Sequence, residues 1–132
     1  MPSAMDVNDA LERVGGNEAL LVRVISIFHK TYGSIIGEIR AALGQGDVEE
    51  AYRKVHTLKG VAASLSAKAV FDAAKKLEAS MRDGGSSEWE SLISELAESM
   101  GAAMAFALEV DRFQSLYPQT ASSTDEGPTR PE

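Results

Sequence analysis

The sequence predicts an all-α protein, an up-down four-helix bundle preceded by a short additional N-terminal helix. Apolar residues recur at the i, i+3, i+4 spacing of amphipathic helices along most of the chain. Short segments rich in Gly and Asp separate these stretches, and short connections favour antiparallel neighbours. The chain has 132 residues, of which 44% are hydrophobic, enough for one buried core.

Two helices are expected in the first third of the chain. A short leading helix over residues 6–14 is stopped by two glycines. Asn17 is a good N-cap for a long second helix whose apolar rhythm continues to Leu43. Gly33 and Gly37 are weak points in this helix, because glycine has a low helix propensity.

Three further helices complete the expected bundle. Asp47 caps a third helix, which ends at a tight connection over residues 64–67. The fourth helix reaches about Arg82 and is closed by an Asp-Gly-Gly sequence. The last helix begins at the serine pair after this turn and reaches about Tyr117, because Pro118 cannot continue it.

The composition divides the chain into three parts. Residues 1–5 form a flexible N-terminus, and residues 6–117 form the helical bundle. Residues 118–132 are rich in Pro, Ser, Thr, Gly and charge, and such a segment buries too little apolar surface to offset its ordering entropy. A disordered tail is therefore expected there.

Charge and composition exclude several classes of function. The chain has 13 Lys and Arg against 20 Asp and Glu, a formal net charge of -7, so nucleic acid is not an expected partner. It has no Cys, which fits a reducing, cytoplasmic setting and leaves no thiolate for a metal site. No metal or cofactor motif, membrane span or nucleotide-binding kinase motif is evident. We expect a soluble monomer that makes no membrane contact, binds no cofactor and is not itself an enzyme.

His56, in the middle of the third helix, is the principal candidate for a functional residue. With Val55 at the centre of the apolar face, an advance of ~100° per residue places His56 on the flank of this face. The neutral ring of a histidine can accept a phosphoryl group at cellular pH. From geometry alone, a solvated histidine on the flank of a helix is the commoner interpretation. His29 lacks a comparable context and is expected to be a surface or boundary residue.

Two neighbours of His56 give it a distinctive context. Lys59, three residues later, lies on the adjacent row of the helix and could stabilise a phosphoryl dianion on the imidazole. Gly60 costs about 1 kcal/mol relative to alanine in a helix, so it needs an explanation. Close approach by a partner is one explanation, and crowding between helices inside the bundle is the other.

The run His-Thr-Leu-Lys-Gly at residues 56–60 resembles the signature of the histidine-containing phosphotransfer (HPt) family. The resemblance extends to ERVGGNEALL near the start, to Phe28, and to AAKKLEASMRDG after the histidine, and it covers about residues 6–113. Many members have a glycine-containing turn after the signature, where this chain has Ala-Ser-Leu-Ser at residues 63–66.

This resemblance implies a function and a set of partners. His56 would relay phosphoryl groups between aspartates of response-regulator receiver domains, one of which belongs to a hybrid sensor histidine kinase. Lys59 would hold the phosphoryl oxygens and Gly60 would admit the partner, which would itself supply Mg²⁺. One alternative is the phosphoacceptor domain of a chemotaxis-type histidine kinase. The other is a helical scaffold in which His56 is never modified.

Overall fold

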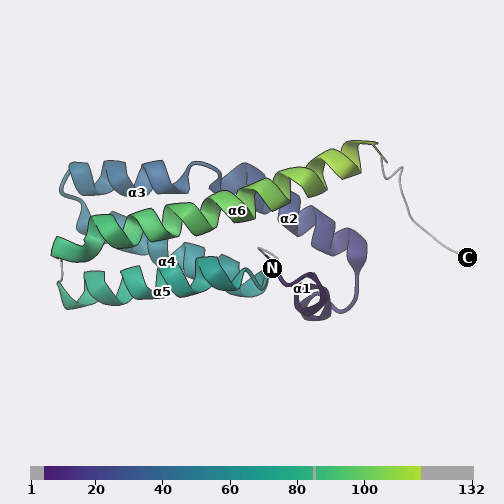
Figure 1. Ribbon diagram of the computed structural model, residues 1–132, viewed down its shortest axis with the longest axis horizontal. Helices are drawn as coiled ribbons and strands as arrows, with labels where there is room; N and C mark the ends of the chain where they lie inside the picture. Colours follow the sequence, from purple (N-terminus) through teal and green to yellow (C-terminus); the bar gives the residue numbers. More distant parts are fainter. Residues whose placement is uncertain (1–4, 85, 117–132) are drawn as a thin grey trace, which may run out of the picture.

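A computed structural model describes residues 5–84 and 86–116 of the chain, and its regular elements in this part are helical. The predicted all-α class is confirmed (Figure 1). In chain order the elements are α1 (Val7–Arg13), α2 (Glu18–Tyr32), α3 (Ile35–Gly44), α4 (Val48–Ser64), α5 (Lys68–Asp83), the 3-10 turn η1 (Ser86–Glu88) and α6 (Trp89–Leu116).

The helices form the predicted up-down bundle with an additional N-terminal helix. α4 packs between α3 and α5, while α6 packs on α5 and returns along α2. Figure 1 shows α3, α4, α5 and α6 side by side, with α1 near one end of α4 and α5. The backbone N–H of Asp6 donates to the carbonyl of Ser66 at 3.0 Å, which ties the start of α1 to the α4–α5 connection.

The expected long second helix is interrupted, and this part of the prediction was wrong. Gly33 keeps helical angles, but Ser34 departs from them at φ -107° and ψ 9°, so α2 and α3 are separate helices. The interruption coincides with one of the two predicted weak points, where glycine lowers the cost of leaving the helix. Because of this break, α2 can pack on α6 while α3 packs on α4.

The predicted caps begin and end the helices where expected. The side chain of Asn17 accepts a hydrogen bond from the N–H of Leu20 at 3.0 Å, and Asp47 accepts one from Glu50 at the same distance. Each cap satisfies a backbone donor that would otherwise lack a partner. Gly84 ends α5 in the left-handed conformation, with φ 82°.

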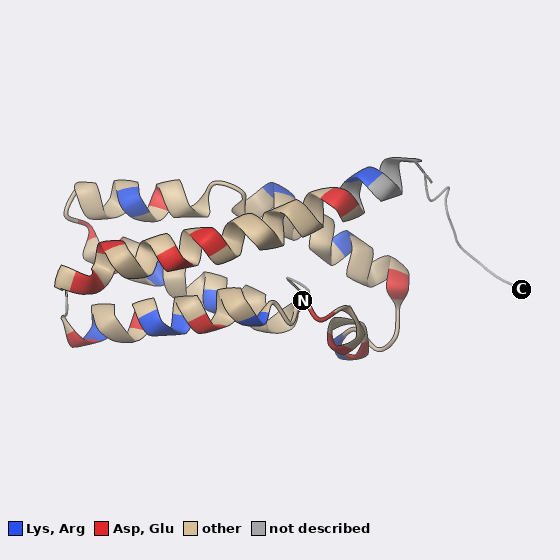
Figure 2. Ribbon diagram, in the orientation of Figure 1, with Lys and Arg blue, Asp and Glu red and all other residues tan. Residues whose placement is uncertain are grey.

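Exposed ion pairs link neighbouring helices, and Figure 2 marks the positions of the charged residues along them. Arg40 of α3 contacts Glu90 of α6 at 2.7 Å. Lys54 of α4 contacts Glu38 of α3 at 3.0 Å, and hydrogen bonding to Glu38 raises the pKa of Lys54. Exposed pairs of this kind contribute little stability, about 0–1 kcal/mol each, so the apolar core holds the bundle together.

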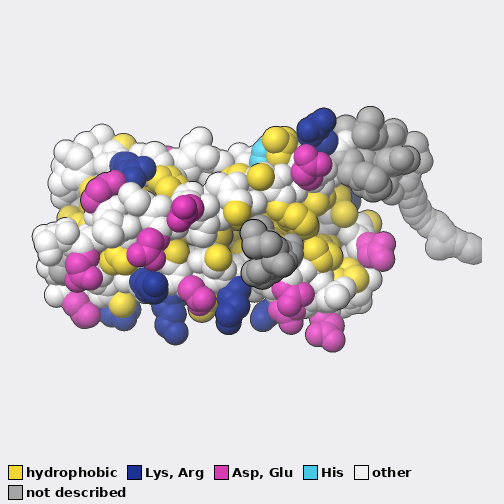
Figure 3. Space-filling model, viewed as in Figure 1, with side chains coloured by type: hydrophobic (Ala, Val, Ile, Leu, Met, Phe, Trp, Pro, Cys, Tyr) yellow, Lys and Arg dark blue, Asp and Glu magenta, His cyan; other side chains and the backbone are white. Residues whose placement is uncertain are grey.

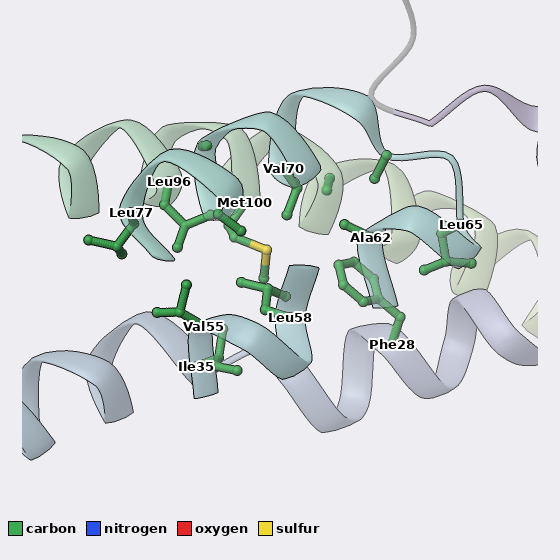
Figure 4. Close-up of a cluster of buried hydrophobic side chains, with 14 of the residues drawn as sticks. Phe28, Ile35, Val55, Leu58, Ala62, Leu65, Val70, Leu77, Leu96 and Met100 are labelled. Carbon is green, nitrogen blue, oxygen red and sulfur yellow. The ribbon is translucent and has the colours of Figure 1, made fainter. Parts of the chain in front are cut away.

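The core is a continuous cluster to which the bundle helices contribute (Figure 4). α4 buries Val55, Leu58 and Ala62, which are all 0% exposed. Burial of a large apolar side chain contributes roughly 1.5–3 kcal/mol, so this face of α4 is strongly held inward. The other residues labelled in the close-up are Phe28, Ile35, Leu65, Val70, Leu77, Leu96 and Met100.

The limits of the bundle can be compared with the predicted domain boundaries only in part. Met5 is 1% exposed, so the packed region includes one residue that was assigned to the flexible N-terminus. The rest of that segment, residues 1–4, and the predicted tail over residues 118–132 lie outside the described residues.

Two stretches of the described chain, Glu18–Gly44 and Ser86–Val110, are long and apolar enough to cross a membrane by length and composition alone. Both supply buried residues to the bundle core, including Phe28 from α2 and Leu96 from α6. The core helix of a soluble protein passes the same test of length and composition.

Candidate functional site

His56 lies midway along α4, at the edge of its buried face. Its neighbours Val55 and Leu58 are fully buried, and their packing fixes the rotation of the helix. The side chain of His56 is 63% exposed. The ring therefore points outward from a helix whose orientation is set by the core.

Glu78 of α5 lies beneath the exposed ring. Nδ1 of His56 is in hydrogen-bond contact with Oε2 of Glu78, and the ammonium of Lys59 contacts Oε1 of the same carboxylate at 2.5 Å. Glu78 is only 3% exposed, whereas the Lys59 side chain is 26% exposed. The three side chains form a cluster across the α4–α5 contact, with the anion inside and the ring outside.

The charge of Glu78 is maintained by its partners. Burial raises the pKa of the carboxyl group, but the hydrogen bonds from Lys59 and then from His56 outweigh burial, so the net pKa lies below its ordinary value. Glu78 is therefore ionised at neutral pH and can only accept hydrogen bonds.

An ionised acceptor determines which ring nitrogen of His56 carries the proton. Nδ1 must be the donor to Glu78, so the neutral ring has its lone pair on Nε2. Tyr52, one turn earlier on α4, lies nearly parallel to the ring, with centroids 6.4 Å apart and an interplanar angle of 11°. These two contacts orient the imidazole while its outer nitrogen remains available as a nucleophile.

Gly60 lies one turn after His56 and is exposed. A Cβ placed at Gly60 would meet nothing within 4 Å, beyond its own neighbours in the helix. Crowding between helices therefore does not explain this glycine. Ala63, two turns after His56, continues the row of small side chains. Because Gly60 and Ala63 carry little or no side chain, nothing large projects from α4 on this side of the imidazole.

The turn after α4 contains Ser66 and no glycine, unlike the glycine-containing turn noted above for the resembling family. Ser66 adopts a left-handed conformation, with φ 53°, which is uncommon for a residue with a side chain. Its hydroxyl donates to Asp9 of α1 and accepts from Nε of Arg13 at 3.1 Å. The hydrogen bond from Ser66, and then that from Arg13, lower the pKa of Asp9.

A cavity of about 260 Å³ lies at this end of the α4–α5 surface. It is lined by α1, by the end of α4, by the turn and by the start of α5, through Asp6, Asp9, Arg13, Ala62, Ala63, Ser66, Lys68 and Phe71. Because Ala63 follows His56 by two helical turns on the same side of α4, the cavity opens about 10 Å from the imidazole along the helix.

The structure brings His56 and Lys59 together at one carboxylate, with Gly60 beside them. His29 lies on α2 and is partly buried. Within residues 5–84 and 86–116, no group of three or more His, Asp or Glu side chains is arranged to hold a metal ion.

Sequence reasoning missed Glu78. A signal was present, because Glu78 follows the core residue Leu77 and lies one turn after Ala74, on the flank of the apolar face of α5. A charge in that position is usually solvated. Only the register between α4 and α5 shows that this carboxylate lies under His56.

Comparison with known proteins gives one match. The family model described as Hpt domain matches residues 23–113, a segment that contains His56, Lys59 and Glu78 and begins after α1. No curated protein and no solved structure shows significant similarity to the chain.

Proposed function

The chain belongs to the Hpt domain family, and from this premise we propose that His56 accepts a phosphoryl group from an aspartate of one receiver domain and passes it to an aspartate of another. Hpt domains are phosphocarriers of phosphorelays rather than complete enzymes. The observation that carries the assignment to His56 is its geometry: an exposed ring whose inner nitrogen donates to a buried carboxylate.

A phosphoryl group can be transferred to Nε2 without loss of a proton from the ring. The Nε2 lone pair attacks phosphorus, a P–N bond forms, and the P–O bond to the aspartyl carboxylate breaks with its electron pair. The phosphorylated ring then carries a positive charge, because Nδ1 keeps its proton. Glu78, which already accepts from Nδ1–H, stabilises this charge as it develops. The reverse sequence delivers the group to the next aspartate.

Lys59 is placed to act on the phosphoryl group. Its ammonium contacts Glu78 beside the ring. The Lys59 side chain is partly exposed, so it lies between the buried carboxylate and the protein surface. A phosphoryl group on Nε2 adds negative charge on the outer side of the ring. Lys59 can then lie between two anions and hold the phosphoryl oxygens by charge-assisted hydrogen bonds.

Gly60 would give a receiver domain access to the imidazole, and the receiver would supply the metal ion. The open space above Gly60 allows the backbone of a receiver domain to approach the imidazole. The receiver contributes Mg²⁺ and its own carboxylates, so this chain needs no metal site of its own. The first donor would be the receiver of a hybrid sensor histidine kinase, and the exchange would occur in the cytoplasm.

The test uses two phosphodonors and one variant. Phosphoramidate, a small donor that releases ammonia on transfer to a nucleophile, and a panel of phosphorylated receiver domains are each incubated with the wild-type chain and with His56→Gln. We expect an acid-labile, base-stable adduct at His56 in the wild type and none in the variant. Because the side chain of His56 is largely exposed, the variant should keep its helical circular dichroism.

The outcomes of this test separate the candidate functions. An adduct elsewhere in the chain would contradict the assignment to His56. In a parallel incubation with a histidine kinase domain and ATP, phosphorylation of His56 by the kinase but by no phosphorylated receiver would instead identify the phosphoacceptor domain of a chemotaxis-type kinase. No adduct with any donor would favour the scaffold hypothesis.

A further inference from the structure

α5 displays a row of basic side chains along the edge that borders the His56 surface. Lys68, Lys75 and Arg82 are spaced by seven residues and are all exposed. Seven residues are almost two full helical turns, so the three side chains form a nearly straight row of about 21 Å. Figure 3 shows Lys and Arg along the lower edge of the molecule, where α5 runs, and Figure 2 shows the basic positions on this helix.

The charges of this row are not neutralised within the part of the chain that the structure describes. The ion pairs found there involve Arg13, Arg40, Arg53, Lys54, Lys59, Lys76 and Arg112, but none of the three residues in the row. Asp72 lies four residues after Lys68 and three before Lys75 but is not among these ion pairs, and it lines the groove between α5 and α6 together with Lys76 and Glu95. A chain with a net charge of -7 thus presents a local line of positive charge.

The row lies next to the site because Glu78 belongs to the same edge of α5. Glu78 is three residues after Lys75 and four before Arg82, and its charge is compensated by Lys59. Lys68 also lines the cavity between α1, α4 and α5. The row therefore flanks His56 and leads to that cavity.

The N-terminal end of α4, away from the cavity, begins with acidic residues. Its cap and first turn carry Asp47, Glu49 and Glu50, of which Glu50 pairs with Arg53 and Lys54 while Asp47 and Glu49 take part in none of the ion pairs found in the described chain. A partner that brings a phosphoryl group and carboxylates to His56 is repelled there and attracted along α5. The cavity beside Lys68, which Asp6, Asp9 and Arg13 also line, includes Phe71 and Ala63, which can bury an apolar side chain of the partner.

From this arrangement we propose that the acidic phosphotransfer surface of a receiver domain docks along α5, with Lys68 and Lys75 pairing with its carboxylates and its contacts extending from His56 over Gly60 into the cavity. This inference rests on the proposed function and names the surface through which the partner is recognised. The wall of the cavity formed by α1 lies before the matched segment 23–113.

The test compares two double variants with the same change in net charge. Lys68→Gln with Lys75→Gln removes two charges from the row, and Arg23→Gln with Lys30→Gln removes two from α2. Arg23 and Lys30 are exposed, are also seven residues apart, and do not take part in the ion pairs found in the described chain. Transfer from each phosphorylated receiver is measured at limiting concentrations, at low and high salt. Phosphorylation by phosphoramidate is measured in parallel.

We expect the row variant to lose about ten-fold in the second-order transfer rate at low salt, with most of the difference abolished at high salt, because steering by exposed charges is screened. The α2 variant should stay within about two-fold of wild type, since its charges lie away from the docking surface. Phosphoramidate needs no docking surface and should modify both variants at the wild-type rate.

A binding footprint provides the second measurement. Amide chemical shifts are followed while an unphosphorylated receiver from the panel is added. Shifts centred on Ala63, Lys68 and Phe71 support the proposal, and shifts centred on Glu49 and the start of α4 overturn it. Equal transfer rates in the two double variants also overturn it, while the proposed function of His56 stands. If the wild type exchanges phosphoryl groups with no receiver, both proposals fail.

Discussion

Replacing Glu78 by alanine tests whether this buried carboxylate sets the tautomer of His56. In the structure the Nδ1–H of His56 donates to Glu78, so the lone pair of the neutral ring is on Nε2. A hydrogen bond to a charged acceptor contributes ~1.5–3 kcal/mol. Water competes for a ring that is 63% exposed. The lower end, ~1.5 kcal/mol, corresponds to roughly a ten-fold bias between the two tautomers.

Long-range ¹H–¹⁵N correlation spectra measure this bias, because they report the protonation of each ring nitrogen. We expect Nδ1 of His56 to be protonated in the neutral wild-type ring, and the tautomer ratio to fall about ten-fold in Glu78→Ala. Phosphorylation by phosphoramidate should slow in parallel. Glu78→Gln is the matched control, since its amide oxygen can still accept from Nδ1–H although it carries no charge.

Either of two results would refute the reasoning. A wild-type ring protonated at Nε2 would place the lone pair on the wrong nitrogen, and an unchanged tautomer ratio in Glu78→Ala would remove the role of Glu78. The resonances of His29 on α2 should be the same in all three proteins and serve as an internal reference. Circular dichroism checks that the alanine variant keeps its helices.

Three further predictions concern the same cluster. Gly60→Ala and the control Gly37→Ala should each raise the free energy of unfolding by up to ~1 kcal/mol, because both sites have room for a Cβ, but only Gly60→Ala should slow transfer to receivers. Equal transfer rates in Gly60→Ala and Gly37→Ala would contradict the role of Gly60 in partner access. Lys59→Ala should lower the free energy of unfolding by about 1–3 kcal/mol, since Glu78 stays buried without its main cation, and adding Glu78→Gln should restore part of the loss. Additive effects in urea titrations would show that the two residues are not coupled. The folded-state pKa of Glu78 lies below its ordinary value of 4.5, so its stabilisation is present above that pH and is lost as the pH falls through the folded value. The urea midpoint of the wild type should therefore fall more steeply below pH 4.5 than that of Glu78→Gln, and parallel curves would contradict this.

The parts of the structure that depend on local sequence could be predicted. The apolar rhythm of α4 and α5 and the caps at Asn17 and Asp47 depend on residues within one or two turns, so α4, α5 and the start of α2 were predicted within a few residues. The position of His56 on the flank of α4 follows from the same periodicity. The local pattern also showed Gly33 as a weak point, although not that the helix breaks there.

The parts that depend on contacts between helices could not be predicted from periodicity. Glu78 is separated from His56 by a turn and most of α5, and its burial depends on how the two helices align. The break after Gly33 accompanies the packing of α2 and α3 on different neighbours, which the local sequence does not encode. The left-handed Ser66 is held by hydrogen bonds to Asp9 and Arg13 of α1, which lie 57 and 53 residues earlier in the sequence.

The cluster reconciles two requirements that a single helix cannot meet. A carrier histidine must be exposed to reach its partners, yet an exposed side chain on one helix is free to rotate. Here a second helix restrains the ring from beneath, through a carboxylate whose burial would be costly without Lys59. The same lysine lies beside the ring, because its ammonium contacts the carboxylate that accepts from His56. Under the proposed function, Lys59 would serve both the folded state before transfer and the phosphorylated state after it, and this sharing predicts that substitutions at Lys59 change stability and transfer together.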